Sequence, residues 1–112
     1  MMKVSCHLIT WGEDILKGMR EASSLGYRAC ETFTHNALAY ENDVETFKQL
    51  LREHGFVLSA LYGGGRFTDK TQRQEIIDYN ERVAKFLVKN GSERIVFGPK
   101  GPRTEGGTTL EE

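Results

Sequence analysis

The sequence predicts an α/β protein built from parallel βα repeats. Three times along the chain a helical pattern ends at a glycine, at Gly26, Gly55 and Gly91, and a short apolar run rich in β-forming residues follows. The glycines recur at roughly the 30-residue spacing that one strand and one crossover helix require. With the apolar run at the start of the chain as a leading strand, we expect strands near residues 3–9, 27–33, 56–62 and 94–98.

The segments between these strands have the pattern of amphipathic helices. Their apolar residues fall on one face and their charged residues on the other, as in helices that cover one side of a sheet. Each segment begins with a capping box, in which one side chain caps the helix and a residue three positions later reaches back. The three pairs are Thr10 with Glu13, Asn42 with Glu45, and Asp69 with Gln72.

The strands at 29–33 and 57–62 are mostly apolar on both alternating faces, which is typical of parallel strands buried on both sides. Two architectures fit this pattern. If every helix covers the same face, the sheet curls toward a closed (β/α)8 barrel of about 250 residues. If the helices alternate between faces, the sheet is open and doubly wound. The first strand is not followed by Gly-x-Gly-x-x-Gly, which weakens the dinucleotide-binding form of the open sheet.

The last residues bear on domain organisation. After the fourth strand a loop leads to Thr108-Thr109-Leu110-Glu111, a further capping box, and the sequence stops one residue later. We therefore expect residues 1–112 to form a single incomplete domain that stops at the start of a fourth helix. Four repeats correspond to about half of a (β/α)8 barrel.

Composition and charge exclude several classes of protein. The chain has 15 basic and 16 acidic residues, so its bulk charge does not favour nucleic acid or an anionic membrane. The first ten residues fit neither a signal peptide nor a membrane span, and we expect a cytoplasmic protein with no nucleic-acid or membrane partner. In that compartment Cys6 and Cys30 are expected to be free, buried strand residues rather than a disulfide.

Candidate site residues lie where the strands end, because both architectures bind ligands at the carboxyl ends of parallel strands. Glu31 is the most informative, since a carboxylate in an apolar strand is costly unless it is paired or lies at a wet pocket mouth. An ion pair with a neighbouring Arg or Lys and a site role both stay open for it. His7 is either a hydrogen-bonded core residue or a ligand, and Trp11 either walls a pocket or packs on its helix. Tyr62 ends the third strand.

Other residues near the strand ends carry weaker signals. The run Gly63-Gly64-Gly65-Arg66 has the composition of an anion-binding loop, but we expect a mobile loop that leaves room for substrate. His35 has no visible partner, and His54 complements the dipole at a helix end. No His-x-x-x-His or Cys-x-x-Cys spacing indicates a metal site, so we assign no metal ligand within this sequence.

The order and spacing of four segments resemble the sugar phosphate isomerase/epimerase family of xylose isomerase-like TIM barrels. These segments are Lys3–Gly12, Leu25–Glu31, Leu50–Ala60 and Ile95–Pro99. The resemblance covers essentially the whole chain but only about the first half of that family's barrel.

The resemblance implies a parent enzyme that moves a proton between adjacent carbons of a sugar or sugar-derived substrate through an enediolate. It implies a divalent metal, such as Mn2+, Mg2+, Co2+ or Zn2+, whose ligands and whose proton-transferring carboxylates come from later strands. It also implies substrate contacts from His7, Trp11, Glu31 and Tyr62. The 112-residue chain is then expected to be inactive alone.

Two alternatives stay open. One is a self-associating half-barrel that binds a small molecule and pairs its open sheet edges with a second copy to form a homodimer. The other is an open-sheet nucleotide-binding domain, for which nucleotides, rather than sugars or metals, raise the melting temperature.

Overall fold

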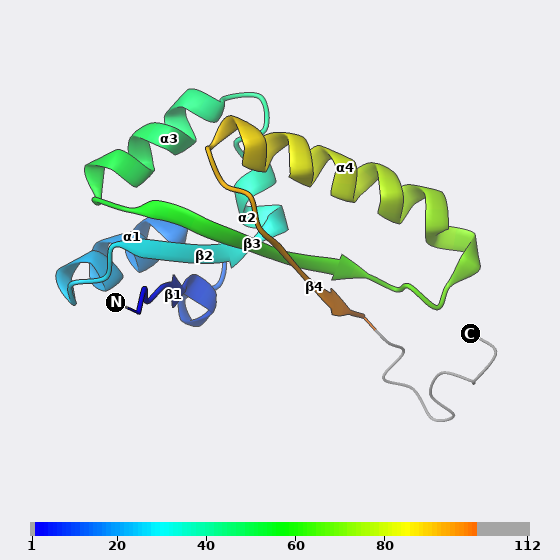
Figure 1. Ribbon diagram of the computed structural model, residues 1–112, viewed down its shortest axis with the longest axis horizontal. Helices are drawn as coiled ribbons and strands as arrows, with labels where there is room; N and C mark the ends of the chain where they lie inside the picture. Colours follow the sequence, from blue (N-terminus) through cyan, green and yellow to red (C-terminus); the bar gives the residue numbers. More distant parts are fainter. Residues whose placement is uncertain (1, 101–112) are drawn as a thin grey trace.

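The computed structural model describes residues 2–100, and its centre is a sheet of four parallel strands (Figure 1). The order of the strands in the sheet is their order along the chain. The strands are Cys6–His7 (β1), Ala29–Phe33 (β2), Val57–Gly65 (β3) and Ile95–Pro99 (β4). The predicted parallel βα repeat is therefore confirmed, since each pair of neighbouring strands is joined by a crossover.

The crossovers contain three long helices and three short ones. The long helices are α1 (Ile15–Ser24), α3 (Val44–Glu53) and α4 (Arg73–Lys89). The short ones are α2 (Thr34–Leu38) and the 3-10 turns η1 (Leu8–Trp11) and η2 (Lys70–Gln72). In the part of the chain that the structure describes, no helix has the length and apolar character needed to cross a membrane. The capping box at Thr108–Glu111 lies outside the described residues.

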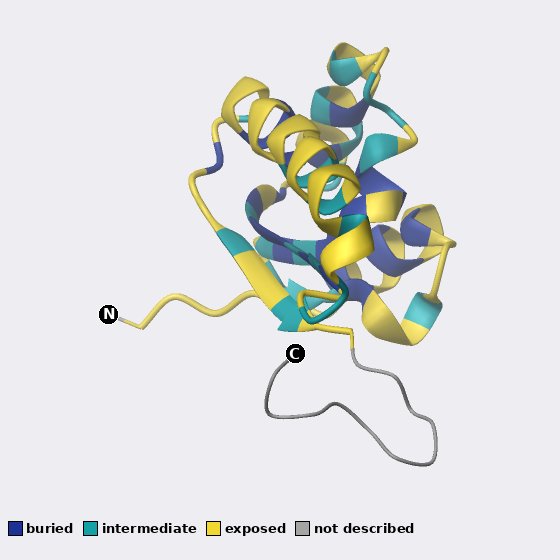
Figure 2. Cartoon of the chain, turned by 90° about the vertical axis from the view of Figure 1, so that its right-hand side faces the viewer, coloured by how far each residue is buried: buried dark blue, intermediate teal, exposed yellow. Residues whose placement is uncertain are grey.

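The three long helices pack on the same face of the sheet. Met19 of α1, Phe47 of α3 and Phe86 of α4 belong to one buried cluster that also contains Cys30 and Leu61 of the strands. In Figure 2 the buried segments, in dark blue, lie where the helices and the sheet face one another, and the outer side of α4 is exposed. A doubly wound sheet has helices on both faces, so this arrangement is that of a barrel segment.

The other face of the sheet, which we call the open face, has no covering layer among residues 2–100. Along β2 the side chains alternate, with Cys30 and Thr32 buried against the helices and Glu31 and Phe33 half-buried on the open face. Val57 at the start of β3 is 67% exposed. The expectation that these strands are buried on both faces is therefore wrong for the described residues, because only one face meets a second layer.

The helix starts differ from the predicted ones by a few residues. Asp14 caps α1 in place of Thr10, because residues 8–11 form η1, and β1 is correspondingly shorter than predicted. Asp43 caps α3 in place of Asn42. Both carboxylates accept a hydrogen bond from the backbone amide three residues later, at 3.1 Å and 3.2 Å. Asp69 caps η2, after which α4 begins.

The glycine run Gly63–Gly65 forms the end of β3 and is paired with β4, so the prediction of a mobile loop is wrong. Each glycine lets a neighbour come close. A Cβ at Gly63 would lie 2.6 Å from the Thr34 Cγ2 methyl, and a Cβ at Gly65 would lie 3.0 Å from Ile76. Gly64 has a φ of +142° and presses against the carbonyl oxygen of Gly98. The three glycines therefore allow β3 to pack closely against α2, α4 and β4.

Candidate functional site

The polar centre of the open face is a pair formed by His7 and Glu31. The two residues are directly opposite each other in the register of β1 and β2. Nε2 of His7 lies 3.3 Å from Oε1 of Glu31, and the side chains are 26% and 22% exposed. The partner of Glu31 is thus a histidine of the neighbouring strand rather than an arginine or lysine. Both groups keep partial access to the solvent in front of the open face.

Aromatic rings surround this pair on the open face. The Tyr62 ring lies edge-on to both His7 and Phe33, with ring centroids 5.9 Å and 5.8 Å away. His7 and Phe33 also meet edge to face at 5.1 Å, which is a favoured geometry for aromatic pairs. The His35 ring stacks on the Phe33 ring, with centroids 5.4 Å apart. We call His7, Glu31, Phe33, His35 and Tyr62 the open-face cluster.

Three of the four site residues predicted from the sequence lie in this cluster, and Trp11 does not. The Trp11 Nε1 donates a hydrogen bond to Oε2 of Glu21 at 2.7 Å. Its ring covers Gly18 of α1, where a Cβ would come within 3.2 Å of the ring. Trp11 therefore packs on α1, the helix that follows it, which was one of the two interpretations left open for it.

Phe33 and His35 were missed as members of the site. Phe33 lies two residues beyond Glu31 in β2, so the alternation of a strand places both on the same face. Once Glu31 is taken as a site residue, this alternation predicts that Phe33 lies beside it. His35 belongs to α2, a five-residue helix that the sequence pattern did not indicate, and its stacking on Phe33 depends on that helix.

The donor set of the cluster does not make a complete metal site. Nδ1 of His7 is buried and has no hydrogen-bond partner, so one imidazole nitrogen is uncommitted. Within residues 2–100, however, no three His, Cys, Asp or Glu side chains converge to hold a metal ion. Protein metal centres of the zinc type use three or four protein ligands. His7, Glu31 and His35 alone therefore do not fit a complete metal centre of this type.

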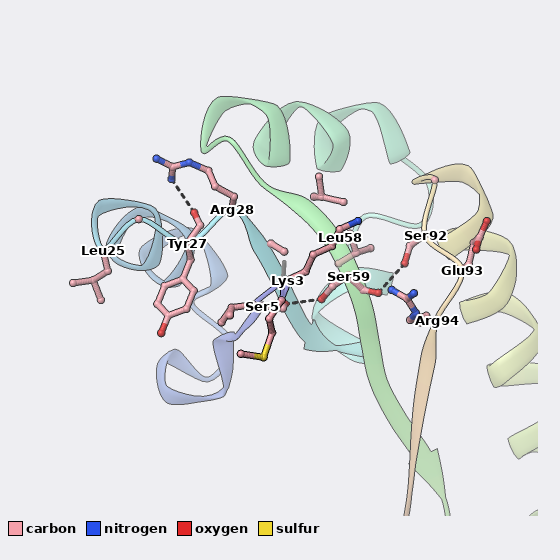
Figure 3. A pocket seen from close by; sticks show the side chains of 16 residues that line it. Lys3, Ser5, Leu25, Tyr27, Arg28, Leu58, Ser59, Ser92, Glu93 and Arg94 are labelled. Atoms are coloured by element: carbon pink, nitrogen blue, oxygen red, sulfur yellow. Dashed lines mark hydrogen bonds between the residues drawn. The ribbon is translucent and has the colours of Figure 1, made fainter.

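A large hollow lies at the other end of the sheet, where the strands begin (Figure 3). Its volume is about 1000 Å3, and Lys3, Arg28 and Arg94 bring basic side chains to it. Ser5 and Ser59, which also line it, share a hydrogen bond of 2.6 Å. In parallel α/β folds the residues at this end serve stability, whereas ligands bind at the carboxyl ends of the strands. The candidate site is accordingly the open-face cluster.

The two cysteines lie outside the cluster. Cys6 and Cys30 are paired in the register of β1 and β2, and both thiols are free. Burial, together with the nearby Cys6, raises the pKa of the Cys30 thiol to about 12. Such a thiol stays protonated near neutral pH and acts as a small apolar core residue. The prediction of free strand cysteines is confirmed, although Cys6 is only half-buried.

Comparison with solved structures identifies the fold. The D-psicose 3-epimerase, solved in the presence of D-fructose, matches with a TM-score of 0.69 and 18% identity over 86% of this chain. The 3-keto-D-glucoside 4-epimerase YcjR from E. coli matches with a TM-score of 0.73 and 22% identity over 100% of this chain. Both are xylose isomerase-like TIM barrels. The fold is that of a partial TIM barrel.

The match covers less than half of either epimerase. This chain spans 37% of the length of the D-psicose 3-epimerase chain and 45% of the 3-keto-D-glucoside 4-epimerase chain. No protein-family model matches the sequence, and no curated protein matches it. The comparisons therefore confirm the predicted partial-barrel fold.

Proposed function

We propose that this chain is the leading part of a metal-dependent sugar isomerase or epimerase barrel and supplies one wall of its substrate pocket. The observation that carries the proposal is the His7–Glu31 pair, which lies among aromatic rings on the open face of a partial epimerase-type barrel. In a closed barrel this face is the interior. Residues 1–112 would then be one part of a single larger domain, with the remaining strands opposite the open face.

The chemistry of the cluster suits a polyhydroxylated substrate. The Glu31 carboxylate accepts hydrogen bonds, the Tyr62 hydroxyl both donates and accepts, and His7 does either according to its tautomer. The rings of Phe33 and Tyr62 offer apolar surface for the C–H faces of a sugar. A few polar groups within an aromatic wall are typical of small-molecule sites.

The proton transfer itself needs groups that residues 2–100 do not bring together. Moving a proton between adjacent carbons of a ketose through an enediolate requires two positioned bases and a Lewis acid such as Mn2+, Mg2+, Co2+ or Zn2+. Glu31 is one carboxylate, and no three metal-ligating side chains converge in this part of the chain. We therefore propose that the metal ligands belong to the rest of the barrel and that the 112-residue chain alone does not epimerise sugars.

The proposal is tested by sugar binding to the purified chain. D-Fructose, the sugar present with the D-psicose 3-epimerase, is the probe, and saturation-transfer NMR together with calorimetry gives the affinity. Glu31→Gln removes the charge that pairs with His7 and is expected to weaken binding about tenfold or more, the effect of losing a charge-assisted hydrogen bond. Glu45→Gln, an exposed helix position 78% accessible at its side chain, is the control.

Three results would contradict the proposal. If D-fructose, D-psicose and other ketoses fail to bind at millimolar concentration, or if Glu45→Gln weakens binding as much as Glu31→Gln, the open-face cluster is not a sugar site. Turnover of a ketose by the purified 112-residue chain would contradict the proposed division between pocket wall and proton-transfer machinery.

A second candidate is a half-barrel that closes by pairing with another copy. The observation in its favour is the exposure of apolar side chains on the open face, with Val57 67% and Val96 39% exposed, beside the free edges of β1 and β4. Size-exclusion chromatography with light scattering separates the two candidates. A defined dimer favours self-pairing, whereas a monomer or a heterogeneous mixture favours part of a larger barrel. The single helix-covered face offers no support for the open-sheet nucleotide-binding alternative.

A further inference from the structure

Tyr62 reaches across the open face from one side of the sheet to the other. Its ring meets His7 of β1 and Phe33 of β2 edge-on, at 5.9 Å and 5.8 Å. Its hydroxyl end lies over β4, directly above the α-carbon of Gly98. The position of the hydroxyl is therefore set by β4, whereas the rest of the ring is held by the neighbouring aromatic rings.

Gly98 leaves no room for a side chain beneath that hydroxyl. A Cβ at Gly98 would overlap the Tyr62 Oη and would come within 2.9 Å of Cζ and 3.6 Å of Cε1. Real Cβ atoms essentially never approach another atom this closely, so either the ring or the strand must move. Only glycine allows the observed placement of Tyr62.

The strand is held from its other side by a second glycine. Gly64 of β3 is paired with Gly98 in the register of the two strands. A Cβ at Gly64 would overlap the carbonyl oxygen of Gly98 and lie 2.9 Å from its carbonyl carbon. The Gly98 backbone is thus packed against β3 and cannot shift toward it. The Tyr62 ring is half-buried at the open face and is the group that yields.

We propose that Gly98 is a positioning residue for the Tyr62 hydroxyl and fixes where this hydroxyl meets a sugar. The proposal rests on the sugar-binding function given above for the open-face cluster. It gives Gly98, a residue of β4, a specific role beside Tyr62. A side chain at position 98 would turn the Tyr62 ring away from β4 and change its orientation toward His7 and Phe33 without removing any polar group from the site.

The test combines a ring-geometry measurement with a binding measurement on the full chain. Gly98→Ala is compared with Gly65→Ala, which crowds Ile76 on the helix-covered side of the same pair of strands. The NMR signals of the His7 and Phe33 ring protons report the Tyr62 ring current. We expect Gly98→Ala to move these signals and Gly65→Ala to leave them in place, whatever the two changes do to stability.

Binding of D-fructose then tests the hydroxyl itself. Gly98→Ala and Tyr62→Phe are each expected to weaken binding several-fold to about tenfold, the effect of one hydrogen bond. The double variant should be no weaker than the weaker single variant, because both changes remove the same contact. A fully additive loss in the double variant, or unchanged His7 and Phe33 signals in Gly98→Ala, would overturn the positioning role. Absence of D-fructose binding by the unaltered chain would instead count against the proposed function, while the ring signals still decide the geometry.

Discussion

Replacing Gly63 with alanine tests how tightly β3 is packed. Gly63 is buried in β3, and its α-carbon faces Thr34 at the start of α2. The new Cβ would lie 2.6 Å from Thr34 Cγ2 and 3.0 Å from Thr34 Oγ1. Thr34 is 4% exposed and its hydroxyl accepts a hydrogen bond from the Tyr79 hydroxyl at 3.0 Å. The substitution therefore displaces the buried Thr34 side chain and strains or breaks its hydrogen bond from Tyr79.

The expected cost follows from three contributions. Overpacking of a filled core costs about 1–3 kcal/mol, and loss of the hydrogen bond from Tyr79 costs about 1 kcal/mol. The lower entropy of the unfolded chain with alanine in place of glycine offsets about 0.4–1 kcal/mol. The free energy of unfolding should fall by about 1–4 kcal/mol, which corresponds to a Tm lower by roughly 5–20 °C in a chain of this size.

Urea unfolding followed by circular dichroism measures this change, and a second substitution identifies its cause. Thr34→Ser removes the Cγ2 methyl that the new Cβ at position 63 would strike but keeps the hydroxyl for Tyr79. In the Thr34→Ser background, Gly63→Ala should therefore cost less than half as much as in the unaltered chain. Equal costs in both backgrounds, or a loss below about 0.5 kcal/mol in the unaltered chain, would refute the close packing inferred for Gly63.

Three further predictions concern the core and the titrating groups. Phe47→Ala should lower the free energy of unfolding by about 3–5 kcal/mol, because Phe47 is fully buried, and a urea-measured loss below about 1 kcal/mol would contradict its place in the core. Burial raises the pKa of Cys30 to about 12, so its thiol should resist Ellman's reagent at pH 8 until urea unfolds the chain. Cys6, which is only half-buried, should react in the folded state. Equal reaction rates of the two thiols in the folded chain would contradict the burial of Cys30. Hydrogen bonds from the Thr46 hydroxyl and amide lower the pKa of the Asp43 carboxyl. The ionised carboxylate therefore stabilises the folded chain at a pH above its unfolded-state pKa, and this stabilisation is lost as the pH falls through its folded-state pKa. An NMR titration should give a midpoint for Asp43 below the usual range for aspartate, and Asp43→Asn should remove this part of the acid sensitivity.

The repeat architecture could be predicted because its signals are local. A glycine at each helix end, a one-faced helix and an apolar strand all lie within about 30 residues of sequence, and the structure has the strands in that order. The partner of Glu31 was not predicted, although the register of β1 and β2 places His7 directly opposite it and the ends of neighbouring parallel strands lie side by side. Periodicity alone left the choice between barrel and open sheet open, because it does not say which face a helix covers, but the resemblance to xylose isomerase-like proteins predicted the barrel, and the fold confirms it.

The features that were wrong or missed depend on partners far away in the sequence. The run Gly63–Gly65 has the composition of a flexible loop, but its role depends on Thr34 and on the Gly98 carbonyl, which no local pattern reveals. The same holds for Gly98 itself, which is needed only because the Tyr62 ring crosses the sheet. Trp11 lies beside a strand end, but a hydrogen bond to Glu21 holds it on its helix.

The most direct test of the proposed sugar site is to map where D-fructose binds on the chain. Assigned backbone and side-chain NMR signals of the chain are followed during a titration with the sugar. The proposed site predicts saturable shifts at His7, Glu31, Phe33 and Tyr62, with none at Lys3, Arg28 and Arg94 around the hollow where the strands begin. Chemical-shift changes confined to residues around that hollow, or changes caused by nucleotides and not by sugars, would contradict the proposed sugar site.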